Sequence, residues 1–126
     1  QQTLIFEKGS YCVGTLFLKS NLHVMLSMGA TITGSTDVSK YPTIPYKNIL
    51  PVHDFITKSL LYAENQSNIT IEGKGTINGN GDHEVFSKDM ENDPGRPFGI
   101  RMVNCTNVHI EGITLKNFAS WTQHYY

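Results

Sequence analysis

One stretch decides the fold: Asn68-Ile69-Thr70-Ile71-Glu72-Gly73-Lys74-Gly75-Thr76-Ile77-Asn78-Gly79, whose two halves recur along the chain. The first half matches Asn21-Leu22-His23-Val24 and Asn107-Val108-His109-Ile110, each an Asn followed by alternating apolar and polar residues. The second half matches Thr31-Ile32-Thr33-Gly34 and Thr114-Leu115-Lys116-Asn117. Alternation with a period of two, bounded by turn residues, predicts short β-strands. The chain is therefore an internal repeat with two strands in each copy.

A third apolar segment precedes each repeated Asn and supplies one more strand to each unit. These segments are Thr15-Leu16-Phe17-Leu18, Leu60-Leu61-Tyr62-Ala63 and Ile100-Arg101-Met102-Val103, with a further copy beginning at Thr122-Gln123-His124-Tyr125. Aligning Leu16, Leu61, Arg101 and Gln123 gives spacings of 45, 40 and 22 residues, so the bare unit has 22 residues. The surplus falls in insertions at 35–59 and 80–97, on one edge of the repeat. Insertions that collect on one face of a repeat protein commonly mark its binding face.

Three short strands per unit, with no amphipathic helix between them, exclude folds built from β-α-β units. We therefore predict an all-β protein, a right-handed parallel β-helix of about three and a half three-strand coils, forming one domain over residues 1–126. Asn21, Asn68 and Asn107 are expected to stack at one corner, unless they are unrelated turn residues. Inward positions that fill the core are expected at Leu16, Leu61, Ile71, Ile77, Ile110 and Leu115.

Composition excludes several classes of partner. The formal net charge is −1, 17% of residues are charged, and no Lys/Arg cluster occurs, so neither nucleic acid nor a membrane surface is expected. No apolar run approaches the roughly 20 residues of a membrane span. The sequence opens without a signal peptide, so an exported protein would have lost its signal. Cys12 and Cys105 are expected as separate buried thiols, although the sequence leaves their disulfide state open.

Further motifs occur in a fixed order along nearly the whole chain. They are Leu4-Ile5-Phe6-Glu7-Lys8-Gly9-Ser10-Tyr11, Gly14-Thr15-Leu16-Phe17-Leu18-Lys19-Ser20-Asn21, Gly29-Ala30-Thr31-Ile32-Thr33-Gly34-Ser35, Ser59-Leu60-Leu61-Tyr62-Ala63-Glu64-Asn65, Gly73-Lys74-Gly75-Thr76-Ile77-Asn78-Gly79-Asn80-Gly81, Arg96-Pro97 and Ser120-Trp121-Thr122-Gln123-His124-Tyr125. In this order they resemble glycoside hydrolase family 28, the polygalacturonase-like enzymes of pectin breakdown. The resemblance implies hydrolysis of α-linked uronic acid polymers with inversion, by Asp carboxyls roughly 6.5 to 9.5 Å apart.

The resemblance covers only the N-terminal coils of such enzymes. Family members carry a capping helix before the segment that matches Leu4, and coils with Asn-x-Asp, Asp-Asp, His-Gly and Arg-x-Lys motifs after the segment that matches Trp121. This chain ends directly after Trp-Thr-x-His, and we expect none of its eleven carboxylates on the first strand of a unit. We therefore expect no catalytic residues here and an inactive chain when it is alone.

Four residues are candidates for substrate binding: Arg96, Arg101, Trp121 and His124. By resemblance, Arg101 and His124 lie on the sheet that floors the substrate cleft, where a cation can bind uronate carboxylates. Trp121 could stack on a sugar ring. The alternatives are a solvent-facing Arg and a Trp packed at a coil corner. The five His residues are scattered and the glycine runs open no helix, so neither a metal, a phosphate loop nor a cofactor is expected.

The function implied is the N-terminal part of a secreted or periplasmic pectin-degrading hydrolase. A non-catalytic carbohydrate-binding or adhesin β-helix, and a pectate lyase with a Ca²⁺ site, stay open as alternatives. Solenoids need polar end caps, and neither end of this repeat has an evident one. We therefore expect self-association through the uncapped ends.

Overall fold

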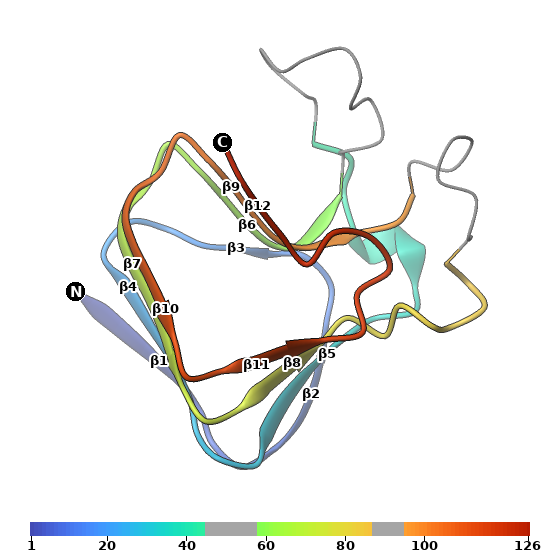
Figure 1. Ribbon diagram of the computed structural model, residues 1–126, viewed down its shortest axis with the longest axis horizontal. Helices are drawn as coiled ribbons and strands as arrows, with labels where there is room; N and C mark the ends of the chain where they lie inside the picture. Colours follow the sequence, from blue (N-terminus) through green and yellow to red (C-terminus); the bar gives the residue numbers. More distant parts are fainter. Residues whose placement is uncertain (45–57, 87–94) are drawn as a thin grey trace.

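The computed structural model describes residues 1–44, 58–86 and 95–126, which form three flat sheets wound into a triangular solenoid (Figure 1). Sheet A contains β1 (Gln2–Phe6), β4 (Leu22–Leu26), β7 (Ser67–Gly73) and β10 (Thr106–Glu111). Sheet B contains β2 (Gly9–Val13), β5 (Ala30–Gly34), β8 (Thr76–Asn78) and β11 (Thr114–Lys116). Sheet C contains β3 (Leu16–Phe17), β6 (Ser59–Glu64), β9 (Phe98–Val103) and β12 (Gln123–Tyr125).

Each strand pairs in parallel with the strand one coil away. The chain passes from sheet A to B to C and repeats that order four times, and it turns anticlockwise as it approaches the viewer, which is the right-handed sense (Figure 1). This confirms the predicted parallel β-helix. The described residues form four coils, slightly more than about three and a half, because β1 and β2 belong to a coil without the repeated Asn.

The register confirms two of the three predicted alignments and corrects the third. Ile69 pairs with Leu22 and Val108, and Thr76 pairs with Thr31 and Thr114, as the repeat predicts. In sheet C, however, Leu61 pairs with Ile100, so the predicted alignment of Leu61 with Arg101 is wrong by one residue. Such a slip reverses every side chain between the inside and the outside of a sheet. Arg101 therefore pairs with Tyr62, and its side chain lies outside the core.

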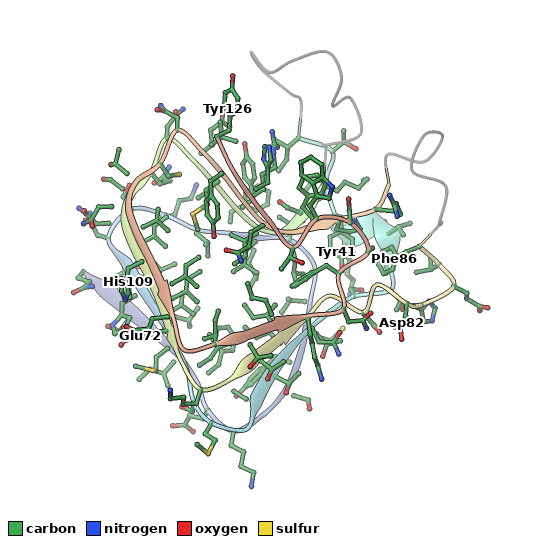
Figure 2. All side chains as sticks on the ribbon, in the orientation of Figure 1. Tyr41, Glu72, Asp82, Phe86, His109 and Tyr126 are labelled. Atoms are coloured by element: carbon green, nitrogen blue, oxygen red, sulfur yellow. The ribbon has the colours of Figure 1, made fainter. Side chains whose placement is uncertain are left out.

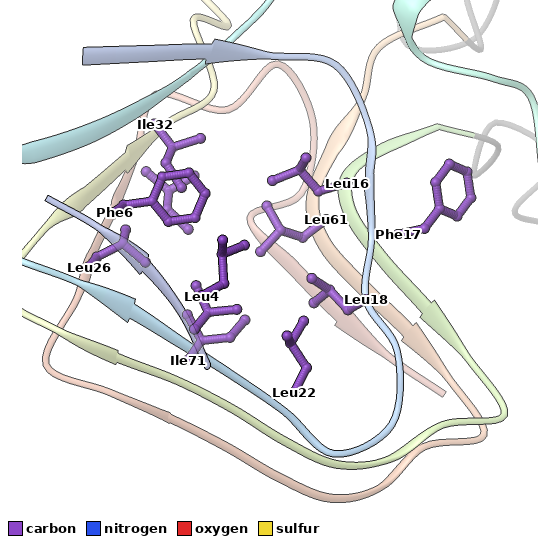
Figure 3. A pocket seen from close by; sticks show the side chains of 12 residues that line it. Leu4, Phe6, Leu16, Phe17, Leu18, Leu22, Leu26, Ile32, Leu61 and Ile71 are labelled. Atoms are coloured by element: carbon purple, nitrogen blue, oxygen red, sulfur yellow. The ribbon is translucent and has the colours of Figure 1, made fainter. Parts of the chain in front are cut away.

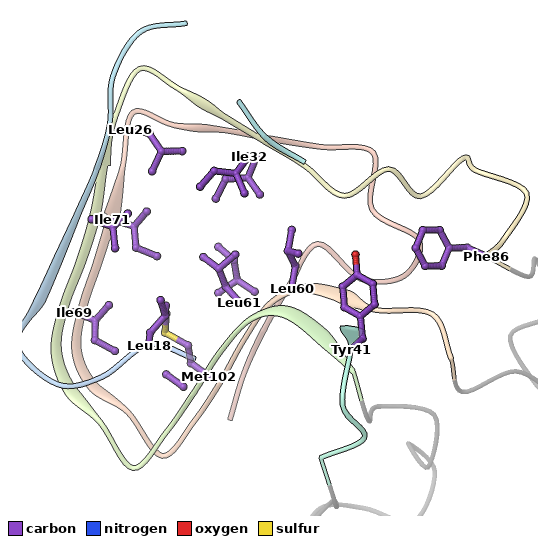
Figure 4. Close-up of a cluster of buried hydrophobic side chains, with 14 residues drawn as sticks. Leu18, Leu26, Ile32, Tyr41, Leu60, Leu61, Ile69, Ile71, Phe86 and Met102 are labelled. Carbon is purple, nitrogen blue, oxygen red and sulfur yellow. The ribbon is translucent and has the colours of Figure 1, made fainter. Parts of the chain in front are cut away.

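The core is a set of stacked aliphatic rows inside the triangle (Figure 4). Leu61, Ile71 and Ile77 are buried as predicted, whereas Leu16, Ile110 and Leu115 are only partly buried because they lie in the outer coils. At the N-terminal end, Leu4 and Phe6 open onto an apolar cavity of about 120 Å³ (Figure 3). Cys12 and Cys105 are separate free thiols as expected, but Cys12 is exposed and Cys105 only partly buried, so the expectation that both are buried is wrong.

A ladder of asparagines occupies the corner between sheets C and A. Asn68 Nδ2 donates to Asn21 Oδ1 at 3.0 Å, and Asn107 Nδ2 donates to Asn68 Oδ1 at 2.7 Å, which confirms the predicted stack. All three have left-handed backbones, with φ of 64°, 61° and 54° in chain order. Asn tolerates this conformation better than other residues with a Cβ, so one residue type provides both the turn and the bond between coils.

Asn68→Ala is expected to destabilise the protein by about 1–3 kcal/mol. The change removes both ladder bonds, at roughly 0.5–1.5 kcal/mol each, and places Ala in a left-handed conformation. Asn107→Ala removes only one of these bonds and should cost less. Urea denaturation of the two variants beside the wild type measures the difference, and equal losses would contradict a role for the ladder beyond the turn.

The described parts of the two insertions leave the solenoid at the same corner, between sheets B and C (Figure 1). The first carries the 3-10 helix η1 (Val38–Lys40) and Tyr41, whose ring meets Phe86 of the second with centroids 6.3 Å apart. Both rings are buried, and the Tyr41 hydroxyl donates to the Ser35 carbonyl at 2.7 Å. Residues 45–57 and 87–94 of these insertions lie outside the described residues. Among those described, no helix is long and apolar enough to cross a membrane.

Candidate functional site on the outer face of sheet C

Four large side chains on neighbouring strands form a row across the outer face of sheet C. The register places Phe17, Tyr62, Arg101 and His124 side by side, one from each coil. Phe17 and Tyr62 meet edge to face at 6.0 Å, and the Arg101 guanidinium carbon lies 5.6 Å from the centre of the Tyr62 ring. This distance is within the range of a cation–π contact. The row therefore holds a buried guanidinium against a buried aromatic ring, with Phe17 exposed at one end.

A second group of rings lies at the insertion side of this row. The ring of Trp121, two residues before the start of β12, lies 5.4 Å from the ring of Phe98 and 6.0 Å from that of His124, between centroids. His124 also contacts Phe98 edge to face at 5.7 Å. Trp121 is nevertheless 40% exposed. It packs at the coil corner, as one of the two interpretations predicts, while part of the residue stays exposed; its stacking on a sugar ring stays a prediction.

Neither of the two candidate arginines, Arg101 and Arg96, faces the solvent. Arg101 is only 2% exposed, so the solvent-facing interpretation does not hold. Arg96 is 9% exposed, and its Nη1 donates to the Ala119 carbonyl at 3.0 Å, which ties the end of the second insertion to the corner after β11. This bond gives Arg96 a structural role; its part in substrate binding stays a prediction.

Tyr62 and Glu64 belong to this face but were missed by the sequence analysis. Tyr62 was missed because the alignment of β6 with β9 was wrong by one residue. Glu64 extends β6, so the expectation that no carboxylate lies on the first strand of a unit is wrong for this residue. The Tyr62 hydroxyl donates to Glu64 Oε2 at 2.9 Å. The pKa of Tyr62 is raised to about 12, mainly by burial and in addition by this hydrogen bond and the negative charge of Glu64.

One carboxylate does not make a glycosidase centre. Inverting hydrolysis uses two carboxyls on opposite sides of the scissile bond, and Glu64 is the single carboxylate on sheet C among residues 1–44, 58–86 and 95–126. Asn80, Gly81 and Asp82 match the residue types of the Asn-x-Asp motif. They lie at the corner after β8, however, where Asp82 accepts a hydrogen bond from Asn117 at 2.9 Å. This corner lies between sheets B and C, so Asp82 is not on a strand of sheet C.

Raising the pH from about 10 to 12 is expected to destabilise the fold. The pKa of Tyr62 is raised to about 12 from its ordinary value of 10.0, so the folded state retains a proton that the unfolded state loses. The stabilisation is fully present below pH 10 and is lost as the pH approaches 12. The pKa of Tyr41 is raised by burial to the same value. Between pH 10 and 12, the urea midpoint of Tyr62→Phe should therefore fall less steeply than that of the wild type, and that of the double variant Tyr62→Phe/Tyr41→Phe least steeply. Equal slopes in all three proteins would contradict the raised pKa of these tyrosines.

The fold and this face define a parallel β-helix with a row of aromatic and cationic side chains on one sheet. No family model matches the sequence. The chain is 36% identical over 119 residues to the exo-poly-alpha-D-galacturonosidase of Dickeya chrysanthemi, a match that covers 86% of this chain and 19% of that enzyme. The chain therefore spans about a fifth of the length of this curated relative.

Two solved structures have the same fold. One is a protein from Parabacteroides merdae proposed to be a glycosyl hydrolase, with a TM-score of 0.77 and 26% identity, over 98% of this chain and 54% of that one. The other is the family 28 exopolygalacturonase of Yersinia enterocolitica, with a TM-score of 0.76 and 23% identity, over 93% of this chain and 29% of that one. The resemblance to glycoside hydrolase family 28 predicted from the motifs is confirmed in sequence by the Dickeya enzyme and in fold by these structures.

Proposed function

We propose that this chain is the N-terminal part of a polygalacturonase-like glycoside hydrolase that acts on a pectin-type polysaccharide. The reaction is inverting hydrolysis of α-linked uronic acid residues, with the catalytic carboxylates outside this chain. The observation that carries the proposal is the buried Arg101 between Tyr62 and His124 on the outer face of sheet C. The 36% identity to a galacturonosidase supports the choice of polymer.

The row on sheet C matches the chemistry of such a polymer. Each uronic acid residue combines a sugar ring with a carboxylate, and the exposed indole of Trp121 provides a stacking surface for the ring. Arg101 acts from beneath the face, because a fixed cation with little solvent around it attracts anions more strongly than an exposed one. His124 is partly buried between the two and completes the surface. Arg96 contributes by holding the Ala119 corner in place.

Calorimetric titration with galacturonate oligomers tests this proposal on the protein and on Arg101→Gln. We expect Arg101→Gln to weaken binding at least tenfold, because it removes the positive charge and leaves a shorter, neutral polar side chain. Lys116→Gln, on the exposed face of sheet B, is the matched control and should bind as the wild type does. Trp121→Ala should weaken binding of charged and neutral oligomers alike.

Two results would count against the proposal. Equal affinity for galacturonate oligomers and for their methyl esters would remove the role of Arg101, and equal weakening by Lys116→Gln would show a non-specific effect of charge. Circular dichroism of each variant distinguishes lost binding from lost folding. The chain alone is expected to release no reducing sugar, and measurable hydrolysis would overturn the assignment of catalysis to residues outside it.

Carbohydrate binding without catalysis is the second candidate, since the row needs no carboxylate pair to hold a polymer. It predicts the same binding results but no hydrolysis in any longer protein that contains this chain. Secretion or periplasmic export, to reach a cell-wall polymer, follows from either proposal. Self-association is proposed through the N-terminal coil, where Leu4 and Ile5 are exposed. Sedimentation over a range of concentrations tests it, and a constant monomer mass would exclude it.

A further inference from the structure

The outer face of sheet A carries a group of histidines and glutamates from three neighbouring coils. Ile69 and Ile71 of β7 point into the core, so Thr70 and Glu72 between and after them point outward. By register, His23 of β4 and His109 of β10 flank Thr70, and Glu111 of β10 lies beside Glu72. Glu72 and His109 project from the same outer side of sheet A (Figure 2). No metal site was predicted, because the five His residues are scattered along the sequence.

The ligand atoms of this group lie close enough to share one ion. One atom each from Glu72, His109 and Glu111 lies within 4.8 Å of the other two. His109 Nε2 is 2.9 Å from Glu111 Oε2, and His23 Nε2 is 3.2 Å from Glu72 Oε1. Ligands at about 2.0–2.2 Å from a tetrahedral Zn²⁺ are roughly 3.3–3.6 Å apart. Small side-chain rotations therefore suffice to bring the three atoms to coordinating distance.

The charges of the group favour a cation. Glu72 and Glu111 are direct neighbours on adjacent strands, and like charges in that arrangement destabilise a sheet. His23 Nε2 is screened from solvent and makes no hydrogen bond of good geometry to any described residue, although it lies beside Glu72. Neutral imidazoles leave both negative charges in place. A divalent ion between the carboxylates removes the repulsion and uses the imidazole of His109 as a ligand.

We propose that Glu72, His109 and Glu111 form a site for a divalent transition-metal ion of the Zn²⁺ class, with His23 positioning Glu72 from the neighbouring coil. One imidazole and two carboxylates suit Zn²⁺, whereas Ca²⁺ and Mg²⁺ take oxygen ligands in larger number. The three ligands leave a fourth position for water or for a group from outside. Because the ligands come from β7 and β10, a bound ion links two successive coils directly, and the contact of His23 with Glu72 extends the group to a third coil.

Zn²⁺ titration of the untagged protein, after removal of metals with a chelator, tests the proposal. We expect one saturable equivalent by calorimetry, an absorption spectrum typical of low coordination number when Co²⁺ replaces Zn²⁺, and a higher melting temperature with Zn²⁺. His109→Gln and Glu72→Gln should each weaken binding at least tenfold. His23→Gln should weaken it less, because His23 acts through Glu72.

The matched control is His83→Gln, which removes an exposed histidine at the turn after β8. It should leave Zn²⁺ affinity, the Co²⁺ spectrum and the melting shift unchanged. Absence of saturable binding, or equal weakening by His83→Gln and His109→Gln, would overturn the proposal. Saturating Ca²⁺ should not displace Co²⁺, and displacement would overturn the assignment to the Zn²⁺ class. His23, Glu72 and His109 lie on the outer face of sheet A and His83 lies in an exposed turn, and circular dichroism verifies that each variant is folded.

Discussion

Gly73→Ala is expected to destabilise the protein by about 3 kcal/mol or more, which is over half the stability of a domain at the low end of the usual ~5–15 kcal/mol. Gly73 ends β7 with a φ of +122°, a conformation that L side chains rarely adopt. A Cβ there would also lie 2.0 Å from the carbonyl oxygen of Leu26, in the next coil. That oxygen already accepts hydrogen bonds from Lys74 and Gly75 at 2.9 and 3.1 Å. The backbone cannot retreat without breaking the contact between coils.

Gly9→Ala is the matched control for this prediction. Gly9 also has a positive φ, of +149°, but the nearest atom to an added Cβ is 3.9 Å away. It therefore carries the conformational cost alone, and we expect a loss of roughly 1–2 kcal/mol. Urea denaturation followed by circular dichroism measures both variants. If Gly73→Ala cost no more than Gly9→Ala, the close approach between coils would not limit this position.

Ile71→Ala is expected to cost about 3–5 kcal/mol. Ile71 is 0% exposed and lies in the middle of an inward row, with Val24 on one side and Ile110 on the other. Truncation there removes buried methyl groups and leaves a cavity that flat, hydrogen-bonded strands cannot close. Ile71→Val removes a single methylene group and should cost only about 0.5–1.5 kcal/mol.

Leu4 provides the comparison within the same row. It pairs with Val24 from the other side but lies in the first coil and is 47% exposed, so less apolar surface returns to water when it is truncated. Leu4→Ala should therefore cost much less than Ile71→Ala in the same denaturation experiment. Similar losses would show that the N-terminal cavity is covered in solution, for instance by a second copy of the chain.

The repeated Asn and the alternation that follows it were sufficient to predict the solenoid. Asn at φ near +60° and an apolar residue at every second position are local requirements, so they are visible in each copy. The alignment of sheet C was harder, because Leu60-Leu61-Tyr62-Ala63 and Ile100-Arg101-Met102-Val103 are apolar at nearly every position. Their burial pattern is uniform in the structure as well. Without alternation, the sequence could not distinguish one register from its neighbour.

The sequence by itself determined the strands, the turns between them and their assembly into stacked coils, since each depends on residues within one unit. Only the tertiary structure decided which side chains meet across coils. It brought Arg101 beside Tyr62, and it brought Glu72 close to His109 and His23 although these residues are far apart in the chain. The physical reason is the parallel stacking itself. Neighbours across a sheet are one whole coil apart in the sequence. Because the insertions differ in length, the local sequence pattern does not show how many residues separate two neighbours.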